Sequence, residues 1–305
     1  MYNLSQYGSI ALVNQTNQRI KKMTAYNNLM DQLQDNGALF NVRTEDVITG
    51  SGIAIPNKKA IINESTGGII GVVGDKYKVV TNEEVFNAFL NTVVESGIDT
   101  DGATLDISFA NNGGKTLVDF RFPNHEIDID GDKSQLRIST LNSYDGSTRL
   151  KARAGALRLA CLNGQLIGGQ AGYSSTHRAS LDINEGARQI MAMLQNFENA
   201  KGMWTKMMAR KVTLDEVMMV FADFSDGNND DLELFGKRPQ TQHLLNLWTT
   251  YSTEMGNTVW ALYNVLTDFI SHKAYKAETK ATGRLYNEGK LERIIESNPL
   301  FLEVA

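Results

Sequence analysis

The sequence predicts an α+β fold in which helices flank an antiparallel sheet and a helical part follows. Two observations predict it. Residues 104–141 hold segments whose apolar residues alternate between turn sequences, and this period of two is typical of strands. From residue 181 onwards, apolar residues recur at helical spacing instead. We therefore place a soft boundary near residue 180, between an α+β core (1–180) and a mainly helical region (181–305).

The first elements of the chain are expected to be a helix and short strands. Residues 16–36 form a polar amphipathic pattern that ends at Asn36-Gly37, a helix stop signal. Short strand-like runs follow at residues 51–56, 60–62 and 68–73. Thr81 or Asn82 is then a suitable N-cap for a helix over residues 85–94.

The central sheet is predicted from two hairpins. Strands at residues 104–110 and 115–122 flank an Asn-Asn-Gly-Gly turn, and Pro123-Asn124 is expected to end the second strand. A further pair at residues 126–129 and 135–141 turns at Asp130-Gly131. Residues 149–162 are then interpreted as a helix that stops at Asn163-Gly164.

The C-terminal region is expected to consist of helices. Thr213 and Glu216 have the spacing of a capping box, which marks the start of a helix over residues 213–224. The other helices are expected at residues 190–208, 240–255, 259–275 and 285–296.

Composition excludes several classes of protein. The 305 residues include one cysteine, Cys161, which rules out an intramolecular disulfide framework and a Cys-rich zinc site. The N-terminus lacks the pattern of a secretory signal, and no apolar run approaches the roughly 18 residues of a membrane span. We expect a cytoplasmic protein without a membrane partner.

Positive charge is concentrated in one segment of an acidic chain. The net charge is −5, yet the segment from Lys133 to Arg178 holds seven basic residues and one acidic residue, Asp145. That segment carries +6 and the remainder −11. Such segregation predicts a local electropositive surface, although solvated strand and helix faces would explain it too.

No catalytic or metal-binding motif stands out. Cys161 lies in an apolar run and is expected to be a small buried side chain. His177 with Arg178 is either a loop cap or an exposed functional pair. Residues 128–132 fail the calcium-loop pattern, and residues 223–231 are expected to form a solvated acidic loop or a weak divalent-ion site. We expect a protein with no enzyme activity, no cofactor and no metal.

Four stretches carry a resemblance to a known family. They are residues 68–86; residues 141–167, with an Asp-Gly-Ser turn and an Arg-x-x-Cys-x-Asn-Gly pattern at Arg158, Cys161, Asn163 and Gly164; residues 176–178 around His177; and residues 257–272, with Trp260, Asn264, Thr267 and His272. Together they resemble the phage/plasmid-like proteins that carry domain of unknown function 932. The resemblance implies a phage protein in the host cytoplasm but no agreed activity.

The basic segment suggests how nucleic acid would be bound. On a helix over residues 149–162, Lys151, Gly155 and Arg158 fall at i, i+4 and i+7, so two cations share a face. Such a helix on a sheet could line a groove that follows a phosphate backbone. The candidate phosphate contacts are Lys133, Arg137, Arg149, Lys151, Arg153, Arg158 and Arg178, with Arg121 also on a strand, and the candidate stacking residues are Tyr144 and Tyr173.

This order of helix, antiparallel strands and basic helix also resembles the core of single-strand annealing proteins (the Sak, Erf and RecT group). That resemblance implies single-stranded DNA held by a homo-oligomeric ring in recombination or replication. The alternative is a protein–protein interaction module with a host or phage partner, such as an inhibitor of a host defence system or an assembly factor. An enzyme with an unfamiliar site would need a cleft that gathers Asp145, Asn163 and His177.

Overall fold

The computed structural model describes residues 4–161, 163–166, 172–178, 180–225, 235–276 and 279–304, and its fold is α+β, as predicted. The elements follow in the order α1 (Leu4–Asp35), β1 (Val42–Ile48), β2 (Ala54–Asn63), β3 (Ile69–Gly74), α2 (Asn82–Glu95), β4 (Thr104–Ala110), η1 (Asn111–Gly113), β5 (Lys115–Ile129), β6 (Asp132–Ser143), β7 (Leu150–Arg158), β8 (Asn163–Leu166), β9 (Gly172–Ser175), α3 (Ile183–Ala209), α4 (Leu214–Phe224), α6 (Pro239–Met255), α7 (Val259–His272), α8 (Lys280–Ser297) and α9 (Pro299–Leu302).

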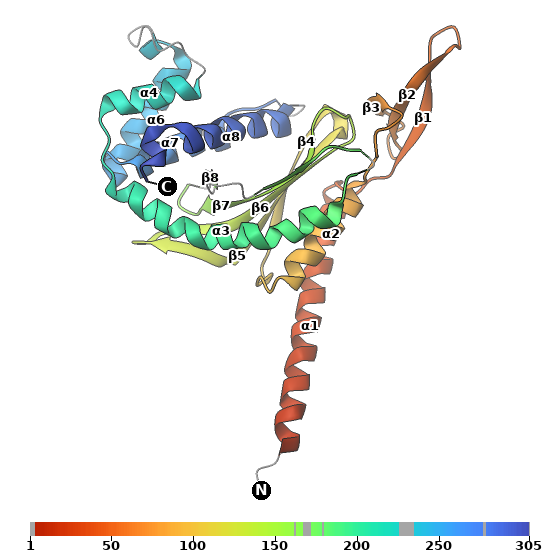
Figure 1. Ribbon diagram of the computed structural model, residues 1–305, viewed down its shortest axis with the longest axis horizontal. Helices are drawn as coiled ribbons and strands as arrows, with labels where there is room; N and C mark the ends of the chain where they lie inside the picture. The colour runs from red at the N-terminus through yellow and green to blue at the C-terminus, as the bar shows by residue number, and fades with distance from the viewer. Residues whose placement is uncertain are drawn as a thin grey trace.

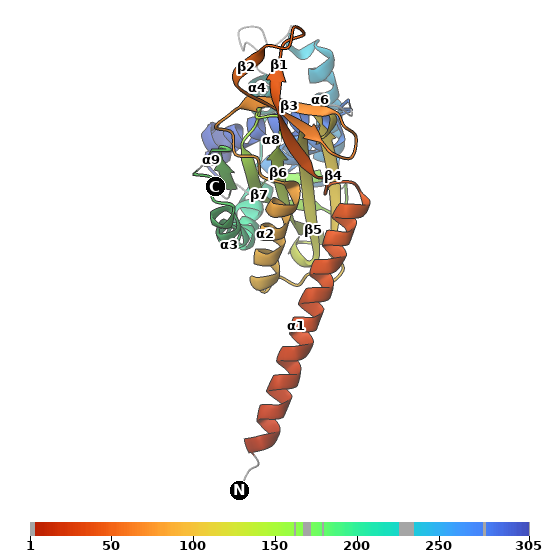
Figure 2. The ribbon, with the colours of Figure 1, turned by 90° about the vertical axis from the view of Figure 1, so that its right-hand side faces the viewer.

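The main sheet lies between two helical layers. Its strands are antiparallel and run in the order β4-β5-β6-β7-β8. On the side of β7 away from β6, residues 155–158 pair with β8 and residues 150–153 pair with β9. Helix α3 crosses one face, while α7 and α8 lie on the other side (Figure 1). A smaller sheet, β1-β2-β3, lies beside the main sheet and its helices, and α1 projects away from both sheets (Figure 2). Among the described residues, no helix is long and apolar enough to cross a membrane.

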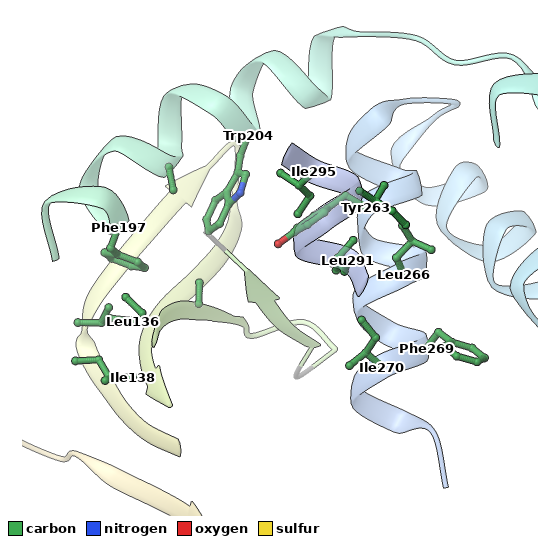
Figure 3. Close-up of a cluster of buried hydrophobic side chains, with 14 of the residues drawn as sticks. Leu136, Ile138, Phe197, Trp204, Tyr263, Leu266, Phe269, Ile270, Leu291 and Ile295 are labelled. Atoms are coloured by element: carbon green, nitrogen blue, oxygen red, sulfur yellow. The ribbon is translucent and has the colours of Figure 1, made fainter. Parts of the chain in front are cut away.

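One hydrophobic core joins the regions on either side of residue 180. Leu136 and Ile138 of β6 share it with Phe197 and Trp204 of α3 (Figure 3). Helices α7 and α8 contribute Tyr263, Leu266, Phe269, Ile270, Leu291 and Ile295. The division into two parts therefore concerns the type of secondary structure, since the core itself is continuous.

The helix predicted over residues 149–162 is wrong, because residues 150–158 form strand β7. Leu150, Ala152, Ala154 and Ala156 are buried against the core, and basic residues alternate with them. Alanine, leucine and arginine all favour helices, but pairing with β6 and burial of every second residue override that propensity. The topological resemblance to annealing proteins rested on a basic helix here and is therefore without that support.

Two smaller predictions also need correction. Pro123 does not end its strand, because β5 continues to Ile129 through a register shift between Phe122 and Glu126. Strand β1 had no predicted counterpart. In contrast, β4 has the predicted bounds, and capping boxes start α2 at Thr81 and α4 at Thr213.

The Asp-Gly-Ser turn of the family pattern joins the two sheets. Asp145 accepts hydrogen bonds from the Ser143 hydroxyl at 2.7 Å and the Asn111 amide at 2.6 Å. A Cβ atom added at Gly71 of β3 would lie 2.7 Å from the Asp145 Cα atom. The small sheet therefore meets the turn backbone to backbone, which explains a glycine at position 71.

We predict that Gly71→Ala destabilises the protein by about 1–3 kcal/mol, because backbone on both sides must move apart. Gly202 of α3 is the matched control, since an added Cβ there meets nothing within 4 Å. Gly202→Ala should stabilise the helix by about 0.5–1 kcal/mol. Urea unfolding of both variants checks this, and equal stability would contradict the close contact.

Candidate functional site

The two faces of the main sheet differ chemically. Cross-strand pairs place Arg121 opposite Arg137, and Asp119 opposite Ser139. Ser139 in turn is opposite Arg153, and Leu141 is opposite Lys151. Because paired residues share a face, these charged side chains lie on the side away from α3. Pairing of β7 with β6 thus places Arg137, Lys151 and Arg153 on one face of the sheet. They share this face because every second residue of a strand points to the same side, and not because they lie on one side of a helix.

Helix α8 covers this polar face through a buried network of four ionised groups. Arg284 Nη1 lies 2.5 Å from Asp119 Oδ2, and its Nε atom donates to Glu288 Oε1 at 3.0 Å. Arg137 lies between the same two carboxylates, with Nη1 3.8 Å from Asp119 and Nη2 3.4 Å from Glu288. Nearby, Arg153 Nη2 lies 2.7 Å from Glu292 Oε2.

The network keeps its carboxylate charged despite burial. Burial alone would raise the pKa of Asp119, but the guanidinium groups of Arg284 and Arg137 outweigh it and hold that pKa well below its usual range. Two cations and two anions therefore compensate one another at the base of the polar face.

Two glycines allow close packing at Arg137, Gly164 against its guanidinium and Gly155 against the neighbouring backbone. A Cβ at Gly164 would lie 2.5 Å from Arg137 Nη1, and one at Gly155 would lie 2.6 Å from the Gln165 carbonyl oxygen. The Gly164 amide also donates to Ser271 Oγ of α7 at 2.9 Å. The glycine of the Asn163-Gly164 pattern is therefore explained by the Arg137 guanidinium, which packs where a side chain would otherwise lie.

A cavity of about 370 Å³ opens beside the network, between the sheet and the corner that joins α7 to α8. Tyr275, from that corner, forms part of its wall. Among the described residues of the lining, the acidic ones are Asp106 and Asp119, and the basic ones are Arg121, Arg137, Lys273, Lys280 and Arg284. This described lining therefore carries an excess of positive charge, on a protein whose net charge is −5.

Some of these cations retain unused hydrogen-bond donors. In the described part of the chain, the buried Nε atoms of Arg121 and Arg137 have no hydrogen-bond partner. Arg121 is 3.8 Å from Asp106, which is an ion pair without close hydrogen-bond geometry. Lys280 is exposed at the start of α8, where the helix dipole also favours an anion. Spare guanidinium donors and a lysine at a helix N-terminus are groups of the kind that bind phosphates and other anions.

The remaining predicted phosphate contacts lie elsewhere. Arg158 is buried on the opposite face and lies 2.7 Å from Asp132, so its charge is already balanced. Lys133 lies 3.1 Å from Glu126. Arg149 and Arg178 are exposed, outside the cavity lining. Of the seven predicted residues, only Arg137 lines the cavity, and it does so from a buried position.

The predicted stacking residues are buried and cannot offer a ring face to a base. The Tyr144 hydroxyl accepts from the Asn82 amide at 2.7 Å, and the Tyr173 hydroxyl donates to the Asp182 carbonyl at 2.7 Å. An exposed aromatic instead lies on α8, where Lys290 Nζ is 4.9 Å from the centre of the Tyr286 ring. Sequence reasoning predicted most of this helix but gave it no role in a site, although Arg284 and Glu288 have the i, i+4 spacing of a helical ion pair.

His177 is buried in a polar cluster rather than exposed beside a cleft. Its Nε2 atom is 3.1 Å from Asn142 Oδ1, and its ring stacks on Tyr77 at 4.9 Å between centroids. Burial lowers the pKa of His177 to about 4. For the enzyme alternative, the Asn163 side chain lies outside the described residues, as do residues 226–231 of the acidic loop. Cys161 is partly exposed, and its sulfur accepts a hydrogen bond from Arg158 at 3.2 Å.

We predict that Arg137→Ala lowers the free energy of unfolding by about 3–5 kcal/mol, because Asp119 and Glu288 are left buried with one fewer cation. The control is Lys59→Ala, which removes a pair with Asp46 that is exposed on both sides and should cost less than about 1 kcal/mol. Urea unfolding measures both, and similar decreases would show that the network is not stabilising.

His177 should make stability depend on pH. Between pH 6.5 and 4, the unfolded chain binds a proton at this residue and the folded protein does not, so the free energy of unfolding falls as pH falls. The shift corresponds to about 2–3 kcal/mol. Between pH 7 and pH 4, the free energy of unfolding of His177→Phe should therefore fall by about 2–3 kcal/mol less than that of the wild type. Parallel pH profiles for the two proteins would contradict this assignment.

Comparison with known proteins identifies the family. No match was found among curated proteins or among solved structures. A family model described as Domain of unknown function (DUF932) matches residues 69–291, which include the whole main sheet, α3, α7 and the cavity-lining part of α8. The match covers well over half of the chain, and the protein belongs to this family.

Proposed function

We propose that this protein is a phage-encoded, non-enzymatic protein that binds single-stranded nucleic acid in recombination or replication. The observation that carries the proposal is the basic cavity between the sheet and α8. Outside the buried network, whose charges balance, its described lining holds three cations, Arg121, Lys273 and Lys280, against one carboxylate, Asp106. A phosphate is the common biological anion that satisfies spare guanidinium donors.

Single strands are favoured over duplexes by the aromatic group on α8. Tyr286 is 59% exposed, and the ammonium group of Lys290 lies over its ring in a cation–π contact. A helix rises about 1.5 Å per residue, so Tyr286 lies about 9 Å along α8 from Lys280 in the cavity. Unpaired bases stack on exposed aromatic rings while adjacent phosphates contact cations. Lys151 on β7, whose neighbour Arg153 pairs with Glu292 near the far end of α8, and Arg149 just before the strand would extend the basic path.

The test is a salt titration of oligonucleotide binding. We predict that Arg121→Gln with Lys280→Gln weakens binding and lowers the slope of log K against log salt by about 1.4, which is roughly 0.7 for each phosphate that the variant no longer neutralises. Fluorescence anisotropy with a labelled single-stranded DNA measures both quantities.

The control variant is Lys58→Gln with Lys76→Gln, which removes the same charge from exposed positions near the small sheet. It should leave the slope unchanged. Wild-type protein that fails to retain the oligonucleotide at low ionic strength would contradict the proposed function. Equal effects of the two double variants would contradict the cavity as its site.

An alternative function, a protein–protein interaction module, is favoured by the β1–β2 hairpin. Ile48 and Ile53 at its tip are exposed apolar residues on a projecting element. Such groups are typical of surfaces that dock another protein. Stoichiometric capture of one host or phage protein, resistant to nuclease and abolished by Ile48→Asp with Ile53→Asp, would support this alternative.

A further inference from the structure

A second cavity, of about 380 Å³, lies between α4 and α9 and has a mixed apolar and acidic character. Its apolar lining comes from Met219, Val220, Pro299 and Leu300. Met219 and the adjoining Leu302 are about half exposed, at 47% and 53%. Apolar side chains gathered around a hollow of this size are typical of a surface that receives a partner.

The rim of this groove keeps an excess of negative charge. Arg210 lies 2.8 Å from Glu216 and 3.0 Å from Glu303, so one guanidinium serves two carboxylates. Asp223 accepts a hydrogen bond from the Asn298 amide at 3.0 Å and, within the described residues, forms no ion pair. The groove therefore suits an apolar partner segment that carries positive charge.

Helix α1 carries a segment with that chemistry. Its C-terminal end is anchored by Leu29 and Leu33, which are buried, whereas the rest of its 32 residues projects beyond the body (Figures 1 and 2). Ile20 and Met23 are exposed at 59% and 63%, and Lys21 and Lys22 lie between them. Lys21 forms an ion pair with Asp101 in which both side chains are exposed, so the pair constrains the lysine little.

The partner that α1 fits is a second copy of this chain. Figure 1 shows α4 and the C-terminus, which follows α9, on the far side of the main body from α1, so one chain cannot make the contact with itself. We infer that the segment of α1 around Ile20 and Met23 docks into the α4–α9 groove of another copy. Lys21 and Lys22 leave the helix on either side of that apolar face, from where their long side chains would reach Asp223 and Glu303 at the rim. This is helix-in-groove recognition, and its head-to-tail geometry produces a ring or a filament.

The test uses two defective variants that complement each other. Ile20→Glu with Met23→Glu alters only the helix, and Met219→Glu with Leu302→Glu alters only the groove. We expect the wild type to assemble and each variant alone to sediment as a 33.8 kDa monomer. An equimolar mixture should give a species of twice that mass, because one intact helix meets one intact groove and the chain cannot extend further.

Ile69→Glu is the control, since Ile69 is equally exposed but lies on β3, away from both surfaces. It should assemble like the wild type, and circular dichroism should show that all variants fold. Wild-type assembly should also weaken as salt rises. A monomeric wild type, variants that still assemble, or a mixture that stays monomeric would each overturn the inference. None of these outcomes depends on nucleic-acid binding.

Discussion

The rest of the structure depends on the attraction between four ionised side chains buried beneath α8. Asp119 and Arg137 come from adjacent strands, while Arg284 and Glu288 come from a helix more than 140 residues later in the chain. A polar sheet face would normally face water, but these groups neutralise one another and allow α8 to lie across it. The helix thereby brings Lys280 and Tyr275 to the sheet edge, and the cavity exists because of that placement.

The same network explains why a basic residue in the central segment need not be available to bind an anion. Arg137 and Arg158 are two of the seven basic residues of the central segment, and both are neutralised inside the protein. Positive charge available to a ligand comes instead from Arg121, Lys273 and Lys280 around the cavity. A protein of net charge −5 can thus carry a local excess of positive charge without being basic over its whole surface.

Sequence patterns predicted the elements that are governed by local rules. The capping box at Thr213 and the bounds of β4 are confirmed, and Thr81 is the N-cap of the two candidates, because caps and short alternating segments depend on near neighbours. The segment that forms β7 was mistaken because its composition favours a helix, whereas its partner strand decides the outcome. The cavity was not predictable from local patterns, since Asp106 and Arg284 meet only after the whole chain has folded. For a related reason the sequence did not show that Tyr144 is buried and Tyr286 exposed, since nothing local distinguishes the two rings.

Photochemical cross-linking of a single-stranded oligonucleotide to the wild-type protein, followed by mass spectrometry of the linked peptides, tests the central claim most directly. If the basic cavity and the outer side of α8 bind the strand, linked peptides will contain residues 273–290, with Tyr275 and Tyr286 as the reactive rings. Cross-links confined to α1 or to the β1–β2 hairpin would place the nucleic acid elsewhere and contradict the account.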